Sequence, residues 1–256
     1  MIVQTEAIVL KQHKIANNRR MIVLFTKKYG KISAGTNMNE GRRGKSALAL
    51  RPFAYSDFEL YKKGSYYNIN GSDLKKSHYS IGEKLDRFMA SSDMISYLEK
   101  IIQEEQPSPK IFDLSIEFLE VISKANDNFD TILLSFYIQS LKYLGIMPEL
   151  KKCVNCGEKI DGLDYIFSVE AGGGLCNKCT NIKTIEAGDR LIFRPTFDII
   201  GTIDYFANNR MNKFLKISLK RQFILQLKQI LNSYVGYYLD VDILNEEWGS
   251  PKLGGK

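Results

Sequence analysis

Four cysteines are the residues of this chain whose type and spacing point most directly to chemistry. They form two Cys-x-x-Cys pairs, the first at Cys153 and Cys156 and the second at Cys176 and Cys179, with nineteen residues between the pairs. A tight turn between paired cysteines points both sulfurs at one ion, and tetrahedral zinc takes thiolate sulfurs at about 2.3 Å. The spacing is typical of zinc ribbons. We therefore predict one structural Zn²⁺ held by Cys153, Cys156, Cys176 and Cys179.

Other roles for these cysteines fit less well. Two disulfides need an oxidising compartment, whereas Met1-Ile2-Val3-Gln4 opens the chain without the apolar segment of a signal peptide. A redox motif normally has a single such pair, and catalytic zinc keeps one position open, which four thiolates would close. Gly172-Gly173-Gly174, just before the second pair, predicts the turn of a hairpin. We expect the metal to fold its segment and to perform no chemistry.

Length and composition bound the class of protein. The chain has 256 residues, 44% of them hydrophobic, which suits an ordinary globular protein of one to about three domains. Its apolar runs fall short of the roughly eighteen residues of a membrane span, and it has no lipidation motif. We expect a cytoplasmic protein that does not interact with membranes.

The distribution of charge is more informative than its total of +7. Residues 1–76 contain fifteen Lys and Arg against five Asp and Glu, a net charge of +10, so the remaining 180 residues sum to −3. Such asymmetry favours a first domain that meets a polyanion. Scattered surface lysines that only confer solubility are the alternative.

The first part of the chain alternates between apolar and polar residues as strands do. A short helix, Ser46–Leu50, ends before Pro52 and lies between the third and fourth expected strands. Three strands, a helix and two strands is the order of an OB-fold, a barrel that binds oligonucleotides or oligosaccharides. The expected strands are Thr5–Leu10, Met21–Thr26, Lys31–Thr36, Phe53–Tyr61 and Tyr66–Asn70.

From Ile81 onward the apolar period becomes helical. We predict helices that end near Pro107 and over 111–122, 129–144, 197–206 and 214–239, with a two-stranded ribbon carrying the cysteines. The fold class is therefore α+β: a five-stranded OB-fold barrel followed by a helical domain with an inserted four-cysteine zinc ribbon. The stripe predicted to be buried on the first helix consists of Leu85, Phe88, Met89, Ser92, Ile95, Leu98, Ile101 and Ile102.

These elements suggest an organisation in five segments. We expect an OB-fold nucleic-acid-binding domain at 1–78 and a helical domain in two parts, at 79–150 and 185–248. A four-cysteine zinc-binding element at 151–184 would separate these parts. The glycine-, lysine- and proline-containing segment 249–256 predicts a disordered tail.

Basic residues gather where the barrel is expected to have loops and strand ends. Each neutralised phosphate releases condensed counterions, so such a row predicts salt-sensitive and sequence-tolerant binding of nucleic acid. Solvated loops are the alternative. Tyrosines of the barrel could add base stacking, or could simply be core or surface residues. The basic residues are Arg19, Arg20, Lys27, Lys28, Lys31, Arg42, Arg43 and Lys45, and the tyrosines are Tyr29, Tyr55, Tyr61, Tyr66 and Tyr67.

Several stretches, taken together and in order, resemble the RecO family of bacterial recombination mediators. The similarity spans most of the chain, and its later part places the cysteine pairs after a Leu-Gly-x-x-Pro lead-in and around the triple glycine. The stretches are Thr5–Leu10, Ile22–Ser33, Arg42–Ser46, Leu50–Phe53, Leu144–Leu150 and Phe167–Ser168.

The resemblance implies a non-enzymatic DNA-repair protein of the RecF pathway. Family members bind single- and double-stranded DNA, anneal complementary strands and act with RecR, and in some bacteria RecF. They let RecA load onto DNA coated by the single-stranded DNA-binding protein SSB. By match to the basic motifs of the family, the DNA-binding residues would be Lys27, Lys28, Lys31, Arg42, Arg43, Lys45 and Arg51, and loop position and charge add Arg19 and Arg20.

Two points depart from this picture. In the first strand-to-strand turn, Ile15-Ala16-Asn17-Asn18 replaces an acidic residue that is common in the family, so the role of this turn is open. Lys213, Lys216, Lys220 and Arg221 would form a basic stripe on a helix, suited to an acidic peptide or simply exposed.

The alternative function is an RNA- or ribosome-associated binding protein, since OB-folds and zinc ribbons also occur in translation factors.

Overall fold

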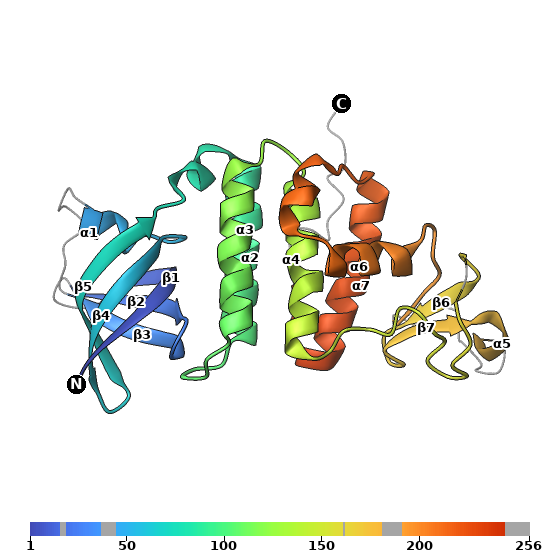
Figure 1. The fold of residues 1–256 in the computed structure, drawn as a ribbon, viewed down its shortest axis with the longest axis horizontal. Coiled ribbons are helices and arrows are strands. Elements are labelled where there is room, and N and C mark those ends of the chain that lie inside the picture. The colour runs from blue at the N-terminus through green and yellow to red at the C-terminus, as the bar shows by residue number, and fades with distance from the viewer. Residues whose placement is uncertain (16–18, 37–44, 161, 181–190, 244–256) are drawn as a thin grey trace. The chain divides into compact units, whose positions relative to one another are not determined.

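The structure is a computed structural model that describes residues 1–15, 19–36, 45–160, 162–180 and 191–243, without the side chains of 45 and 46. Its contacts divide the chain into two compact units, residues 1–129 and 130–256. Figure 1 shows strands followed by two long helices in the first unit, and helices with a small sheet in the second. Each unit is described by itself.

The first unit begins with a closed five-stranded barrel. Its strands pair in the order β1-β2-β3-β5-β4, and the parallel pairing of β3 with β5 closes the ring, as in an OB-fold. The expected barrel is therefore confirmed, with a short helix, α1, between the third and fourth strands. The elements are β1 (Ile2–Lys14), β2 (Arg20–Thr26), β3 (Gly30–Thr36), α1 (Lys45–Leu48), β4 (Tyr55–Lys63) and β5 (Tyr66–Lys76).

Alternation along the strands determines which side chains fill the barrel. In β4, Ser56, Phe58 and Leu60 are buried at 0%, 1% and 0% exposure, while Asp57, between Ser56 and Phe58, is exposed. The long strand β1 pairs with β2 along one part and with β4 along another, and its register with β2 shifts between Val9 and Lys11. Such a bulge bends a strand, which allows β1 to pair with both β2 and β4.

Two long helices of the first unit pack beside the barrel. Phe112 of α3 lies edge-on to Phe25 of β2, with ring centroids 5.4 Å apart, and 6.2 Å from the ring of Tyr55 of β4. Pro109 occupies the first turn of α3, where its missing N–H leaves no intrahelical bond unmade. The elements are a 3₁₀ turn, η1 (Tyr79–Glu83), α2 (Leu85–Ile101) and α3 (Pro109–Lys124).

The stripe expected to be buried on α2 is wrong at the start of the helix. Leu85 and Phe88 are 73% and 45% exposed, whereas Arg87 is only 5% exposed. The guanidinium of Arg87 donates to the main-chain carbonyls of Ser80 and Ala125, and Ala125 ends α3. A cation at a helix C-terminus is favourable. The first turn of α2 therefore buries Arg87, whereas the ring of Phe88 is about half exposed.

The second unit is built around α4, whose residues from Thr131 to Leu141 are all buried. Lys228 of α7, 6% exposed, donates to the carboxylate of Asp130 at 2.7 Å, and the side-chain amide of Gln139 donates to the carbonyls of Phe206 and Asn209. These bonds satisfy polar groups that would be costly if buried alone. The helices are α4 (Phe129–Leu144), α6 (Ile199–Asn208), η2 (Met211–Lys216) and α7 (Arg221–Leu239).

Two expectations for the second unit need correction. The small sheet has three strands in the order β7-β6-β8, because β6 (Tyr165–Ser168) pairs with both β7 (Gly173–Cys176) and β8 (Ile192–Phe193). The expected ribbon had only two. The basic stripe at 213–221 is not on one helix either. Lys213 and Lys216 belong to η2, Lys220 lies between the two elements, and Arg221 begins α7.

None of the helices in the described ranges is both long and apolar enough to cross a membrane. The expected domain boundaries stay a prediction. The contact division places α2 and α3 in one unit with the barrel.

The segment between α2 and α3 lies close against β3, which makes Gly30 a sensitive position. An added Cβ at Gly30, whose φ is +68°, would lie far inside contact distance of the Gln106 main chain, whereas at Gly64, with φ +60°, it would meet nothing within 4 Å. We expect Gly64→Ala to cost about 1 kcal/mol from backbone strain alone. Gly30→Ala should cost roughly 1–3 kcal/mol more, because of overpacking.

Equilibrium denaturation of the two variants tests this difference. Equal free energies of unfolding would contradict the close approach of residue 106 to the barrel, since both glycines share the same backbone conformation.

Candidate functional site

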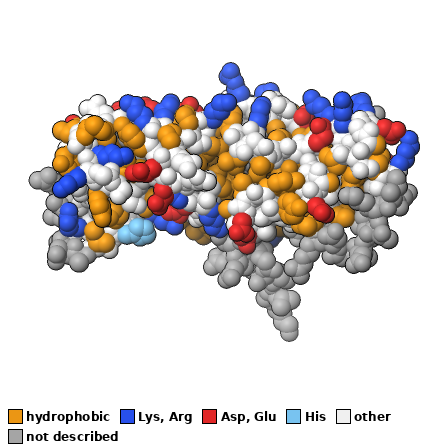
Figure 2. Space-filling model, turned by 90° about the horizontal axis from the view of Figure 1, so that it is seen from below, with side chains coloured by type: hydrophobic (Ala, Val, Ile, Leu, Met, Phe, Trp, Pro, Cys, Tyr) orange, Lys and Arg blue, Asp and Glu red, His pale blue; other side chains and the backbone are white. Residues whose placement is uncertain are grey.

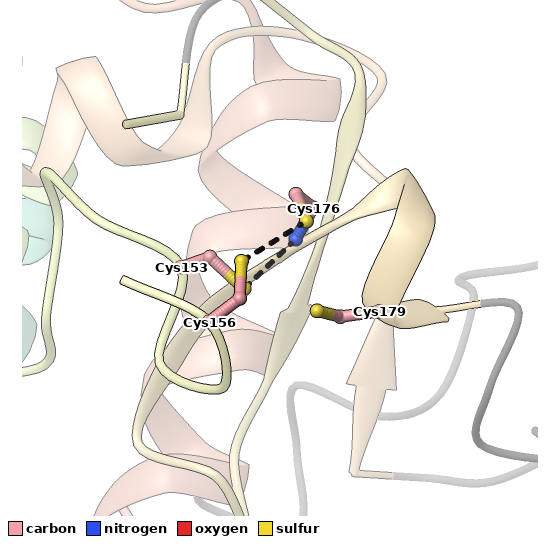
Figure 3. A group of neighbouring side chains, drawn as sticks. All are labelled: Cys153, Cys156, Cys176 and Cys179. Atoms are coloured by element: carbon pink, nitrogen blue, oxygen red, sulfur yellow. Dashed lines mark hydrogen bonds between the residues drawn. The ribbon is translucent and has the colours of Figure 1, made fainter. Parts of the chain in front are cut away.

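The four cysteines, far apart in pairs along the chain, converge in the second unit. Their sulfur atoms all lie within 4.8 Å of one another, and Cys156 Sγ is 3.7 Å from Cys176 Sγ. Figure 3 shows the four side chains pointing toward a common centre. Sulfurs at about 2.3 Å from a tetrahedral ion are about 3.8 Å apart. The donor set and the spacing therefore fit a metal ion.

Two different local structures bring the cysteines together. The first pair lies in a turn in which the N–H of Gly157 donates to the carbonyl of Cys153 and the N–H of Cys153 donates to Glu158. The second pair begins at the last residue of β7 (Gly173–Cys176) and ends in the short helix α5 (Asn177–Thr180). Each pair thus closes a turn that directs both of its sulfurs to one side.

Hydrogen bonds join the two pairs through the sulfur atoms. The N–H of Cys176 donates to Cys153 Sγ at 3.4 Å, and the side-chain amide of Asn155 donates to Cys179 Sγ at 3.3 Å. Donors to sulfur stabilise the thiolate, which is the form that binds metal. Cys153 and Cys179 are buried, whereas Cys156 is exposed. The cluster therefore has a closed side and an open side.

The thiols also influence one another's ionisation. Burial of Cys153 opposes ionisation, but N–H donors, that of Cys176 foremost, outweigh it and lower the pKa of Cys153 to about 6. At Cys156 the N–H of Glu158 also lowers the pKa. Desolvation and the three neighbouring thiols outweigh it and raise the pKa of Cys156 to about 12. Four negative sulfurs in so small a volume repel one another, so a cation is needed for all four to be thiolates at neutral pH.

The triple glycine does more than form the expected turn. Only Gly172, with φ +77°, lies in the turn, while Gly173 and Gly174 belong to β7. A Cβ on Gly173 would collide with the carbonyl of Glu149, and one on Gly174 would lie 2.8 Å from Ile200 Cδ1. Gly173 thus lets the segment before the first cysteine pair lie directly against β7, while Gly174 leaves room for the side chains of Ile160 and Ile200.

The nucleic-acid-binding residues expected from the sequence fall into several groups. Arg42 and Arg43 lie outside the described residues, as does the side chain of Lys45, which begins α1. Arg19 is exposed just before β2, whereas Arg20 is only 7% exposed and donates from Nη1 to Gln12 Oε1 at 3.1 Å. The guanidinium group of Arg19 is therefore more open to solvent than that of Arg20.

The three lysines near the β2–β3 turn differ in their partners. Lys27 Nζ is 2.9 Å from Asp113 Oδ1 of α3, and this hydrogen bond raises the pKa of Lys27. Lys31 Nζ donates to the main-chain carbonyl of Glu99 in α2 at 2.6 Å. Lys28 is exposed and donates to the carbonyl of Gln4. Lys27 thus has a carboxylate partner, whereas Lys28 and Lys31 donate to main-chain carbonyls.

Other lysines of the barrel are paired with carboxylates in the same way. Lys11 pairs with Glu99, Lys62 with Glu105 and Lys76 with Glu120, so acidic residues of 99–120 meet basic residues from several strands. Lysine and arginine are scattered over the face drawn in Figure 2, with hydrophobic and acidic side chains between them. Local sequence patterns do not indicate these pairs, because the partners are distant along the chain.

The tyrosines considered for base stacking also divide by exposure. Tyr66 and Tyr61 are 77% and 42% exposed on the outer face of the β4–β5 hairpin, whereas Tyr67 is 4% exposed. Tyr29 packs against Tyr67, with centroids 6.4 Å apart, and Tyr55 donates to Glu6 Oε1 at 2.9 Å. Of these five tyrosines, Tyr61 and Tyr66 present open rings. Sequence reasoning missed the exposed rings of Tyr79 and Phe88, since a helical stripe was expected to bury Phe88.

Comparisons with known proteins cover nearly the whole chain. A family model described as "Recombination protein O N terminal" matches residues 1–78, and one described as "Recombination protein O C terminal" matches residues 82–245. A protein named "DNA repair protein RecO" from Alkaliphilus metalliredigens is 29% identical over 242 residues, 94% of this chain and 95% of its own length. Proteins of that name from Thermoanaerobacter sp. and Bacillus pumilus are 26% and 24% identical, over 96% and 93% of this chain and 96% and 90% of their own lengths.

If the cysteine cluster is a metal centre, Cys153→Ser should lower metal content and thermal stability together. Metal binding by a site that does not exist in the unfolded chain contributes directly to folding. Each kcal/mol lost should lower Tm by about 2–4 °C in a chain of this size. Elemental analysis of the purified protein and a thermal melt provide the two measurements.

A chelator supplies the control for this variant. It should lower Tm of the unaltered chain toward that of Cys153→Ser and leave the variant itself unchanged. Full stability of the unaltered chain after its metal has been removed would contradict a structural role.

Proposed function

This chain belongs to the recombination protein O (RecO) family, and we propose that it acts as a DNA-binding mediator that anneals complementary strands. The family has a role in DNA repair and recombination, which this chain shares. The proposal of DNA binding and strand annealing is supported mainly by the closed OB-type barrel, which residues 1–76 form. The net charge of these residues is +10. Barrels of this kind bind oligonucleotides.

The proposed mechanism is electrostatic. Two DNA strands repel each other, and a positively charged surface that contacts both lowers this repulsion without any covalent step. The family is one of repair mediators, and we propose that this chain also binds and positions DNA without catalysing a reaction. Single-stranded and double-stranded DNA would both bind, because their phosphates carry the attraction.

Within the barrel, residues without a carboxylate partner are the best candidates for phosphate contacts. Lys28 and Arg51 are exposed, and neither has a salt bridge within the described part of the chain. Lys27 would have to exchange a carboxylate of α3 for DNA, and Lys31 is only partly exposed and would have to leave a main-chain carbonyl of α2. We therefore propose that Lys28, Arg51 and the segment with Arg42, Arg43 and Lys45 contribute more than Lys27 and Lys31.

The proposed partners follow from the role. A mediator of this family would act with RecR, and with RecF where it is present, on DNA coated by SSB, and RecA would load afterwards. This set of partners is a proposal that rests on family membership.

We further propose that the ion at the cysteine cluster is one Zn²⁺, bound by Cys153, Cys156, Cys176 and Cys179. Thiolate donors in this arrangement suit zinc. When bound, the ion would supply a cross-link between the first turn and β7. Four thiolates leave no open position, so the role would be structural.

The test of the proposed function is annealing of complementary oligonucleotides coated with SSB, with and without RecR. We expect the chain to accelerate annealing, because it would bring both strands to one basic surface. Strand pairing is followed by fluorescence resonance energy transfer between end labels. No acceleration over SSB-coated DNA alone would contradict the proposal, and preferential binding of structured RNA in competition would favour an RNA-binding role.

The basic segment before α1 has its own test. Replacing Arg42, Arg43 and Lys45 together by alanine should weaken DNA binding and reduce the slope of log K against log salt by about 2–3, since each lost phosphate contact removes about 0.7–0.9. Fluorescence anisotropy over a salt series measures both quantities.

A variant with equal loss of charge elsewhere provides the control. Lys213, Lys216 and Lys220, all in the second unit, replaced together by alanine, should change the slope less. An equal change in both variants would show only an effect of net charge and would overturn the assignment of the segment.

A further inference from the structure

A cavity of about 580 Å³ lies at one end of the barrel in the first unit. Its walls come from β1 and β2, α1 and the turn that follows, η1 and α2. The volume falls within the roughly 300–1,000 Å³ of small-molecule sites. All of its lining residues lie in the first unit.

The charged residues that line this cavity in the described part of the chain are arginines. Arg20 and Arg51 both line it, and no Asp or Glu is found among its lining residues within the described part of the chain. Arg20 is 7% exposed and is oriented by Gln12, while the exposed guanidinium of Arg51 has no partner among the described residues. Guanidinium groups bind phosphate through paired N–H donors. This end of the cavity therefore suits an anion.

Aromatic rings form another part of the wall. Phe88 of α2 is 45% exposed and lies edge-on to Phe53, with ring centroids 5.8 Å apart, and Tyr79 of η1 is 69% exposed. Large exposed rings at the edge of a cavity cost free energy in water. A planar apolar group inserted there would cover them. The cavity thus combines an anion site with a stacking surface.

The backbone around the cavity is held in an unfavourable conformation. Phe53 has φ +69° and His78 has φ +46°, and His78 Nδ1 donates to the carbonyl of Phe53 at 2.8 Å. The N–H of Phe53 in turn donates to Val9 of β1 at 3.0 Å. A bulky residue at positive φ is a true outlier, and such strain gathers at ligand sites. These bonds fix the position of Phe53 beside Phe88.

We propose that this cavity binds one nucleotide of a single-stranded DNA chain, with its phosphate at Arg20 and Arg51 and its base against Tyr79 and Phe88. A ligand that has both an anionic group and a flat apolar ring fits both parts of the wall. The inference rests on the proposed DNA-binding function and locates a base-binding site within it. Every base offers a stacking face, so the site would not select a sequence.

A strand fits better than a free nucleotide. Tyr79, at 69% exposure, extends well beyond an enclosed pocket, and it borders solvent where a neighbouring nucleotide would continue. Arg51 is likewise exposed. The site is therefore open enough for a chain to enter and leave, and the phosphate contacts would be shared with the adjoining backbone.

The experiment uses the full chain and an oligothymidylate that carries one 2-aminopurine, whose fluorescence is quenched when it stacks. The Tyr79→Ala variant should lose the quenching and bind roughly 5- to 50-fold more weakly, as expected for loss of one stacking contact. Arg51→Ala should reduce the salt slope by about one. Tyr237→Ala and Arg194→Ala are the matched controls, since Tyr237 is 51% exposed and Arg194 is exposed, both in the second unit.

Circular dichroism confirms that each variant is folded. Wild-type quenching and affinity in both Tyr79→Ala and Arg51→Ala would overturn the site while leaving the proposed function in place. No binding of the oligonucleotide by the unaltered chain would overturn the proposed function, and this site with it. Displacement of the oligonucleotide by an equal concentration of thymidine monophosphate would reassign the cavity to free nucleotides.

Discussion

Ion pairs between the barrel and the helices that follow it are the interaction on which the first unit depends. Lysines from several strands meet Glu99, Glu105, Asp113 and Glu120, all within α2, α3 or the segment between them. Each exposed pair contributes little to stability. Together they determine which basic groups of the barrel are engaged by the protein itself. The phosphate-binding surface that we propose consists of the basic groups that these pairs leave open.

A different constraint organises the small sheet of the second unit. Its strands have two to four residues, too few for independent stability. The buried sulfurs of Cys153 and Cys179 belong to its hydrophobic cluster, together with Ile166 and Leu175. A bound ion would therefore stabilise a core that is too small to hold the segment alone.

Local pattern was enough to predict some of these features. Alternation in Phe53–Tyr61 located β4 and its buried face, and the cysteine spacing located the cluster. Prediction failed where the position or pairing of a side chain depends on residues elsewhere in the chain. Periodicity placed Phe88 on the buried side of α2, but Arg87 faces inward because Ser80 and Ala125 offer it carbonyls. The count of charges predicted that Lys27 and Lys31 are free to bind nucleic acid. Their partners, the carboxylate of Asp113 and the main-chain carbonyl of Glu99, are distant from them in the sequence. The third strand, β8, was too short to have a pattern.

The pairing of Lys27 with Asp113 has a consequence for how DNA affinity relates to charge. A lysine that leaves a carboxylate for a phosphate exchanges one partner for another, so its net gain is only the difference between two similar attractions. In the proposed DNA-binding role, the carboxylates of α2 and α3 would thus compete with DNA from within the same chain. Removing one of them would act on affinity as the addition of a lysine would, without adding any basic group to the protein.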